Sequence, residues 1–234
     1  MQLSRRMQRL ASLVTEGNRL ADVGTDHGYI PIALIKEKKI PFAVAMDVNE
    51  GPLVRAREHV RESGLSTYIE LRLSDGLAEL KEGEADTILI AGMGGMLIIR
   101  ILEEGRNCLN TVKELVLQPQ SDIYRVRKWL SEHGYLIEAE DIVEEDGKYY
   151  PMMKAVHGQE RELEQSELFY GKTDVQRSVH ILYDWLLAEH DRKRKVMEKL
   201  QRNAREHTQR GREIAADMER IVYCCQKIGM TVSQ

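Results

Sequence analysis

The chain has 234 residues, enough for one domain of about 150 residues with its own core and a smaller second unit. It contains no apolar run of about 18 residues, and its N-terminus lacks the apolar stretch of a signal peptide, so we expect a cytoplasmic protein with no membrane partner. The three cysteines fit neither a disulfide framework nor a zinc site, and no metal is expected.

Charge is unevenly distributed along the chain, although the formal net charge is only −4. Residues 191–212 are strongly basic, whereas residues 138–167 are strongly acidic. A basic stretch is most often a solvated helix face. The functional alternative is a contact with a polyanion such as nucleic acid, whose affinity would fall with salt.

Short apolar segments of strand type alternate with helical patterns from residue 19 to about 156. The expected strands are 19–23, 42–47, 68–73, 86–92, 114–118, 135–145 and 148–156. The expected helices between the first six strands are 29–38, 51–63, 95–104 and 122–134. Strands separated by helices of this length predict βαβ units and a parallel, doubly wound α/β sheet.

The last two expected strands are separated by too few residues for a parallel crossover. We therefore expect an antiparallel hairpin that turns at Asp146 and Gly147. Pro151 removes a backbone donor from the final strand, which suits an edge or a bulge.

The pattern becomes helical after the last strand, so we expect a first domain of residues 1–158 and a helical second domain of residues 159–234. Apolar residues between 197 and 228 recur at alternating intervals of three and four, which is a heptad pattern. His207 and Gly211 interrupt its centre. We expect two long helices that fold back on each other with a turn between 202 and 211; one long helix that pairs with another chain is the alternative.

The first strand leads into the turn Gly24-Thr25-Asp26-His27-Gly28 rather than the G-x-G-x-x-G of a dinucleotide site. A carboxylate among the amides of such a turn repels a phosphate by a few kcal/mol at about 4 Å. It favours a ligand that is cationic at this point, such as S-adenosylmethionine. His27 is a candidate general acid or base, or a residue that orients the loop by hydrogen bonding.

Two further acids follow the next strands. Asp47 can accept both hydroxyls of a ribose, or else cap the following helix. Asp75 can accept from the adenine amine, with the Gly76 amide near the ring, or else be a plain turn residue. Acids at the carboxyl ends of three successive parallel strands predict an S-adenosylmethionine site.

The fourth strand ends in the small residues AGMGG, residues 91–95. It lacks the asparagine with which many methyltransferases hold an exocyclic amine, so a ring nitrogen is favoured as the methyl acceptor. Small residues let a planar base approach the backbone closely. For Gly94 and Gly95, close packing of strand against helix is an equal alternative. Gln118, Pro119 and Gln120, after the fifth strand, are candidates for the substrate side.

These segments together resemble the bacterial tRNA (adenine-22-N1)-methyltransferase family, called TrmK, from residue 1 to about 156. The resemblance rests on LADVGTDHGYIPIAL, AMDVNEGPLVRARE, RLSDGL, ILIAGMGGMLI, LVLQPQS and EDGKYY. It implies a Rossmann-like class I methyltransferase sheet of seven strands, the last antiparallel, followed by a coiled-coil-like helical domain. It also implies methyl transfer from S-adenosylmethionine to N1 of adenosine 22 in tRNA. His59 stands where the family leads us to expect Asn, and Gln120 where we expect Met.

The resemblance also assigns residues by position. The expected cofactor-binding residues are Gly24, Thr25, Asp26, His27, Gly28, Asp47, Val48, Asp75, Gly76, Ala91 and Gly92. The target base is expected to meet Met93, Gly94, Gly95 and Pro119. Asp26 and His27 are the catalytic candidates. The basic residues proposed to contact tRNA phosphates are Arg5, Arg6, Arg9, Arg192, Arg194 and Arg202.

Other functions stay open at this point. A methyltransferase of the same fold would act on another RNA or a small molecule, and a catalytically idle module would only bind RNA. The turn itself disfavours a NAD-dependent oxidoreductase. We expect a monomer, with a dimer through the helical domain as the alternative.

Overall fold

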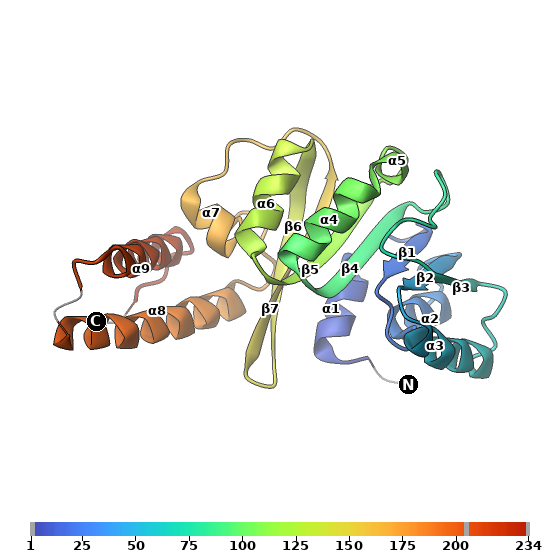
Figure 1. The fold of residues 1–234 in the computed structure, drawn as a ribbon, viewed down its shortest axis with the longest axis horizontal. Coiled ribbons are helices and arrows are strands. Elements are labelled where there is room, and N and C mark those ends of the chain that lie inside the picture. The colour runs from blue at the N-terminus through green and yellow to red at the C-terminus, as the bar shows by residue number, and fades with distance from the viewer. Residues whose placement is uncertain (1–2, 204–205, 233–234) are drawn as a thin grey trace. The chain divides into compact units, whose positions relative to one another are not determined.

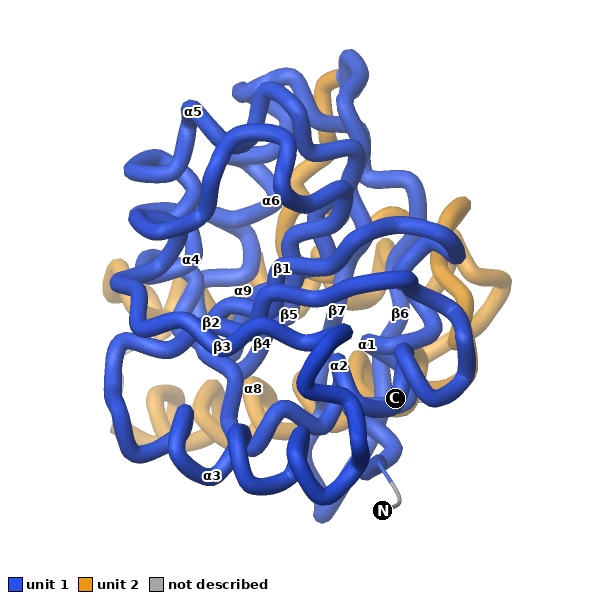
Figure 2. Tube along the Cα trace, turned by 90° about the vertical axis from the view of Figure 1, so that its right-hand side faces the viewer, with its two compact units in different colours: residues 1–161 blue, residues 162–234 orange. Residues whose placement is uncertain are grey.

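A computed structural model describes residues 3–203 and 206–232 of the chain (Figure 1). The chain divides into two compact units, residues 1–161 and residues 162–234, which Figure 2 shows in different colours. The first unit is built on a sheet, and the second is helical.

The first unit contains a seven-stranded sheet in the order β3-β2-β1-β4-β5-β7-β6. Its strands are β1 Leu20–Val23, β2 Ala43–Asp47, β3 Ile69–Leu73, β4 Thr87–Gly94, β5 Glu114–Ser121, β6 Tyr135–Glu145 and β7 Lys148–His157. The first five pair in parallel, whereas β7 is antiparallel to both β5 and β6. The predicted parallel sheet with a final antiparallel hairpin is confirmed.

Pro151 has no backbone N–H, and it lies at a position in the sheet where this missing hydrogen-bond donor is tolerated. It pairs with Ile142 of β6. Strand β5 pairs with β7 only over residues 153–156, so Pro151 lies outside the part of β7 that has two neighbouring strands. The prediction of an edge-like position for Pro151 agrees with this register.

Six helices of the first unit are described. They are α1 Arg5–Leu13, α2 Tyr29–Lys36, α3 Glu50–Glu62, α4 Gly95–Glu104, α5 Arg106–Leu109 and α6 Ile123–Glu132. The four predicted helices are confirmed with ends that differ by at most two residues. Helices α1 and α5 were not predicted. The sequence signal for α1 was present, because Ser4 precedes apolar residues at helical spacing. In the structure the Ser4 side chain caps the helix by accepting from the Met7 amide at 3.4 Å.

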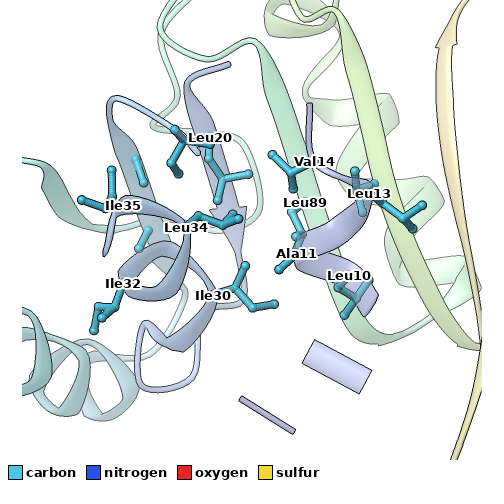
Figure 3. Packing of buried hydrophobic residues seen from close by; sticks show 14 of the residues in the cluster. Leu10, Ala11, Leu13, Val14, Leu20, Ile30, Ile32, Leu34, Ile35 and Leu89 are labelled. Carbon is cyan, nitrogen blue, oxygen red and sulfur yellow. The ribbon is translucent and has the colours of Figure 1, made fainter. Parts of the chain in front are cut away.

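Helices α1 and α2 share one apolar cluster on the sheet. Figure 3 shows Leu10 and Ala11 of α1 near Ile30 of α2 and Leu89 of β4. All four side chains are buried. Because strand side chains alternate between faces, Ile88 and Ile90 belong to the opposite face, toward α4 and α6. Helix α1 is thus part of the core, and it brings its polar residues beside the carboxyl ends of β1 and β4.

Gly95 is a packing residue at the start of α4. A methyl group added to it would lie 2.5 Å from the carbonyl oxygen of Ser121 and 2.9 Å from that of Asp122. Only a glycine lets the two backbones approach so closely. At Gly94 the added methyl would meet the Ser121 hydroxyl at 3.2 Å, a milder contact with a side chain. The packing interpretation of Gly95 therefore has a direct geometric basis.

The second unit consists of α7 Gln165–Tyr170, α8 Val179–Arg202 and α9 Gln209–Lys227. Helices α8 and α9 pack against each other, so the predicted pair of helices with a turn between 202 and 211 is confirmed and the single long helix is wrong. His207 is exposed in this turn and does not belong to the apolar seam. The regular knobs-into-holes geometry of a coiled coil stays a prediction.

Gly211 lies in the first turn of α9 rather than in a helix interior. The Thr208 side chain caps this helix by accepting from the Gly211 amide at 3.3 Å. A methyl group at Gly211 would lie 1.9 Å from the Glu206 carbonyl oxygen. The helix start therefore requires the glycine that the heptad pattern disfavoured.

Within residues 3–203 and 206–232, no helix is both long and apolar enough to span a bilayer. The same residues contain no group of three or more His, Cys, Asp or Glu side chains placed to hold a metal ion.

Candidate active site

A cavity of about 280 Å³ lies where the carboxyl ends of β1 and β4 meet α1 and α2. Its walls combine six polar or charged side chains with small and apolar residues. The lining residues are Arg6, Met7, Leu10, Asp22, Val23, Gly24, Thr25, Asp26, Tyr29, Ile30, Leu89, Ala91, Gly92 and Gln120. The carboxyl edge of a parallel sheet, at the point where the order of the strands reverses, is where such folds bind ligands.

The turn after β1 is held in an unusual backbone conformation. Gly24 (φ 78°), His27 (φ 69°) and Gly28 (φ 68°) all lie in the left-handed region. The amides of Gly24 and Thr25 both donate to the carbonyl oxygen of Met46, at 2.8 and 2.9 Å, which anchors the turn to β2. A non-glycine residue in this region is uncommon, and strain of this kind is frequent in turns at functional sites.

Asp22 is the buried acid of this cavity, and sequence reasoning missed it. Only 6% of its surface is exposed. Burial raises the pKa of its carboxyl from 3.8 to about 6; the Thr25 hydroxyl lowers this pKa and the charge of Asp47 raises it further. Among the described residues, no basic side chain forms an ion pair with it. An acid in an otherwise apolar strand, just before the turn, was the available signal.

Asp26, the acid that the sequence singled out, is far more exposed. Its side chain is 62% exposed and accepts from Arg55 of α3 at 3.0 Å, with His27 Nε2 at 3.3 Å. Arg55 had no predicted role. Asp26 therefore lies at the mouth of the cavity with one charge partner, whereas Asp22 lies inside it.

Three rings gather beside Asp26. The centroids of His27, Tyr29 and His59 lie 5.0 to 5.3 Å apart with small interplanar angles. His59 Nδ1 lies 3.1 Å from the carbonyl oxygen of His27, a hydrogen bond that supports the left-handed conformation of His27. His59, the position at which the family suggested Asn, thus contacts the turn through both its ring and its nitrogen.

The two other predicted acids lie along the same edge, outside the cavity lining. Asp47 accepts from the Asn49 amide at 2.7 Å, and Asn49, not Asp47, is the N-cap of α3. Asp75 pairs with Arg100 at 3.5 Å, and both side chains are more than half exposed. Val48, next to Asp47, leaves 57% of its surface exposed, which provides an apolar face for a ring.

The end of β4 combines a bulge with bare backbone. The register between β4 and β5 shifts between Ala91 and Met93, and Gly92 has a φ of 77°. The Gly92 amide donates to the Oε1 of the fully buried Gln118 at 3.1 Å. A methyl group added to Gly24 would lie 2.2 Å from Met93 Cε, so the Met93 side chain covers the turn.

The arginines proposed to contact tRNA have different environments. Arg6 lines the cavity, and Arg9 lies 3.5 Å from the buried carboxylate of Asp141. Arg5 is exposed. In the helical unit, Arg192 pairs with Glu189, whereas exposed Arg202 has no ion pair within the described part of the chain.

The structure brings some predicted residues together and separates others. Within the cavity lie Gly24, Thr25, Asp26, Ala91, Gly92 and Arg6. Outside its lining are His27, Gly28, Asp47, Val48, Asp75, Gly76, Met93, Gly94, Gly95 and Pro119. Pro119 is the pairing partner of Met93 in the sheet. The predicted site residues thus form a line along the sheet edge, from the end of β3 to the cavity beside β4.

The charge and shape of this row of residues fit S-adenosylmethionine. The buried carboxylate of Asp22 lines the cavity and forms no ion pair with another described residue. This suits a cationic group of a ligand. The left-handed glycines leave room beside the backbone. No cluster of basic groups suited to a pyrophosphate lines the cavity.

Comparisons with known proteins agree with this geometry. Residues 3–153 match the family model described as a methyltransferase domain. The tRNA (adenine(22)-N(1))-methyltransferase of Bacillus subtilis is 41% identical over 158 residues, which cover 68% of this chain and 66% of that protein.

Solved structures extend the likeness into the second unit. The crystal structure of B. subtilis TrmK has a TM-score of 0.81 at 32% identity, covering 94% of this chain and 97% of that one. A Streptococcus pneumoniae structure in complex with S-adenosyl-L-methionine has a TM-score of 0.83 at 35% identity, covering 94% and 98%.

Proposed function

Since the chain belongs to the bacterial tRNA (adenine-22-N1)-methyltransferase family, TrmK, we propose that it transfers the methyl group of S-adenosylmethionine to N1 of adenosine 22 in tRNA. The observation that carries the proposal is that the likeness to B. subtilis TrmK covers both units, 94% of the chain, and not the methyltransferase unit alone. The acids along the sheet edge support the choice of cofactor.

The chain's residues mainly align the two reactants. S-adenosylmethionine supplies the methyl group as an electrophilic sulfonium, and the reaction is an SN2 displacement. Neutral adenine N1 already carries a lone pair, so no residue has to create the nucleophile, and positioning accounts for much of the rate gain. Asp22, Asp47 and Asp75 bind the cofactor along the edge. The bare backbone of Gly92 lets the target base approach.

We propose that Asp26 stabilises the positive charge that the base gains on methylation. Exchange of Asp26 for asparagine keeps the shape and removes the charge. We expect kcat to fall about tenfold, because one exposed electrostatic contact is lost. The dissociation constant of S-adenosylmethionine should stay within about twofold, because the buried Asp22, and not the exposed Asp26 that is paired with Arg55, is the main acid of the cavity. Single-turnover methylation and calorimetry measure the two quantities.

Asp75→Asn is the matched control for Asp26. It removes an equally exposed acid at the adenine end of the edge, and we expect weaker cofactor binding with an unchanged single-turnover rate. An Asp26→Asn enzyme with full turnover and normal cofactor binding would show that Asp26 has no part in catalysis.

The helical unit is our candidate for the main tRNA contact, and the ion pairs within it suggest which arginines matter. Arg202 is exposed and unpaired in the described residues, whereas Arg192 pairs with Glu189. We expect Arg202→Gln to weaken tRNA binding several-fold and to reduce the salt slope by about 1, because one phosphate contact is lost. Arg192→Gln is the control and should change both less. Filter binding at several salt concentrations measures the affinity for tRNA and its salt slope. Equal behaviour of the two variants would contradict the assignment of Arg202 as a phosphate contact.

The function itself is tested with unmodified tRNA and methyl-labelled S-adenosylmethionine, followed by mapping of the labelled nucleoside. We expect 1-methyladenosine at position 22. The same tRNA with guanosine at position 22 is the control and should take up no label. Label at another position of the tRNA would assign the enzyme to a different nucleoside. Label that appears only when a tRNA-free cell extract replaces the tRNA would assign it to a different substrate. We propose that the enzyme acts in the cytoplasm as a monomer.

A further inference from the structure

A second cavity, of about 560 Å³, lies where α2 ends and where the chain enters β2 and β3. Its volume is in the range of roughly 300–1,000 Å³ that is typical of pockets for small molecules. We call it the lysine pocket, and its lining residues are Glu16, Gly17, Ile35, Lys36, Lys38, Lys39, Ile40, Pro41, Leu65 and Tyr68. It belongs wholly to the first unit and shares no lining residue with the cavity beside β1 and β4. It is therefore a separate site, at the amino ends of the strands.

One part of this lining is apolar and includes an exposed ring. The side chains of Ile35 and Ile40 are buried, and Leu65 is half-buried. In Figure 3, Ile35 lies at the opposite end of α2 from Ile30, which lines the first cavity. Tyr68 leaves 50% of its surface exposed. Such a ring can stack with a nucleobase of any kind, as in proteins that bind single-stranded nucleic acid.

The rest of the lining is basic. Lys36 and Lys38 are exposed, and neither forms an ion pair within the described ranges 3–203 and 206–232. Lys39 is different, because its Nζ donates to the carbonyl oxygen of Ala11 at 2.7 Å and is held against α1. Among the described lining residues, Glu16 is the one acid beside three lysines. The lysine pocket therefore favours an anion, and the two exposed ammonium groups suit a phosphate.

Lys38 is held in a backbone conformation that usually requires glycine. Its φ is 58°, and it directly follows Glu37, the C-cap of α2. Its amide donates to the Ile35 carbonyl oxygen at 3.0 Å, and the Lys39 amide donates to that of Leu34 at 2.9 Å, which is the Schellman motif. Glycine is the usual residue at this position, because a side chain is strained there. Strain of this kind often accompanies function, and here the strained residue lines the pocket.

Helix α1 connects the lysine pocket with the first cavity. Met7 and Leu10 line that cavity, and the carbonyl oxygen of Ala11, at the next position, holds Lys39. The two sites lie at opposite ends of the strands, and a five-residue strand such as β2 spans about 16 Å. About five stacked nucleotides, at roughly 3.4 Å each, cover the same length. One folded RNA is therefore large enough to reach both sites.

We propose that the lysine pocket binds an unpaired nucleotide of the tRNA, with the base stacked on Tyr68 and its phosphates at Lys36 and Lys38. This inference rests on the proposed function, and it adds a second contact, outside the helical unit, that fixes the orientation of the tRNA. A free nucleotide has the same chemistry, but two exposed lysines hold a single phosphate weakly. In a tRNA that is already bound elsewhere, the effective concentration of the nucleotide at the pocket is much higher.

The first test removes the charges in the full-length protein. In the double variant Lys36→Gln with Lys38→Gly, we expect tRNA affinity to fall about tenfold in low salt. The salt slope should fall by about 1.4, at roughly 0.7 for each phosphate contact of a single strand. Filter binding at several salt concentrations measures both quantities. Lys38→Gly alone should leave the melting temperature unchanged or raise it by up to about 3 °C, because glycine relieves the strain, so unfolding would not explain the lost affinity.

The second test removes the ring. Tyr68→Leu keeps an apolar side chain, and we expect tRNA affinity to fall about 5- to 100-fold with an unchanged salt slope, because stacking releases no counterions. Lys128→Gln is the matched control for the lysine variants. It removes an exposed lysine on α6 that pairs with Glu132 at 3.7 Å, and its tRNA affinity should stay within about twofold of the wild type.

The outcomes separate the possible failures. A wild type that neither binds nor methylates tRNA would overturn the proposed function. A wild type that methylates adenosine 22, with lysine and Tyr68 variants that bind tRNA as Lys128→Gln does, would overturn only the lysine pocket. Calorimetry with adenosine monophosphate is the third arm, and we expect it to bind at least about 100-fold more weakly than tRNA. Tight binding of this nucleotide that is lost in Tyr68→Leu, with tRNA affinity unchanged, would assign the pocket to a free nucleotide and overturn the tRNA contact.

Discussion

Replacing Asp22 with asparagine is expected to stabilise the ligand-free protein and to weaken its binding of S-adenosylmethionine. The wild-type carboxyl has a pKa of about 6 when folded and an ordinary value of 3.8. Between pH 4 and pH 6 the unfolded chain loses this proton and the folded protein keeps it, so stability falls as pH rises through that window. The loss approaches about 3 kcal/mol above pH 6.

The asparagine variant does not ionise and should avoid this loss. We expect it to be more stable than the wild type by up to about 3 kcal/mol at pH 7.5, with little difference at pH 4. Urea unfolding at both values measures this, and comparing two proteins cancels the other titrating groups. Its affinity for S-adenosylmethionine should fall about 10- to 100-fold, because a charged contact to the ammonium group is lost. A stability difference that does not depend on pH would contradict the buried, perturbed carboxyl.

Removal of Glu140 is expected to destabilise the first unit severely. Arg127 of α6 donates to Glu140 Oε1 of β6 at 2.6 Å, and both side chains are only 2% exposed. Glu140→Ala removes the carboxylate that lies 2.6 Å from the buried guanidinium, and the expected loss for breaking such a buried ion pair is about 3–5 kcal/mol. That is a large part of the total stability of a typical domain.

The double variant Arg127→Met with Glu140→Leu separates the charge effect from packing. It removes both charges and keeps apolar volume, so most of the lost stability should return. Denaturant unfolding of the wild type and the two variants completes the comparison. If the double variant is as unstable as Glu140→Ala, the pair contributes through shape and not through charge balance.

Much of the fold was predictable because its signals are local. Periodicities of two and about 3.6 residues indicate strands and helices, and a short polar turn at Asp146 and Gly147 indicates the hairpin. Helix α1 was missed although Ser4 marks its start, because its N-terminal half is rich in arginine and its buried residues, Leu10, Ala11 and Leu13, form only a short apolar stripe. In the second unit the heptad pattern continued through His207, which the structure places in the turn.

The site was predictable only in its outline. The sequence of the turn identified Gly24 and Asp26 as site residues, because the spacing of glycines and the presence of a charge are evident within a few residues. The sequence could not rank Asp26 against Asp22, since their difference is burial: one side chain lies at the mouth of the cavity and the other inside it. The arginines proposed to contact tRNA were likewise predicted without knowledge of their partners. In the structure several of them form ion pairs with acidic residues.

The sequence by itself determined the parallel sheet, the final hairpin and the row of acids at the strand ends. These follow from local periodicity and from the rule that parallel strands end at one edge. Only the tertiary structure decided what each charge does, because its partners are distant in the chain. Arg9 meets Asp141 across 132 residues and the Arg6 amide donates to Glu145 across 139, so α1 is held against β6 and Arg6 joins the lining of the cavity.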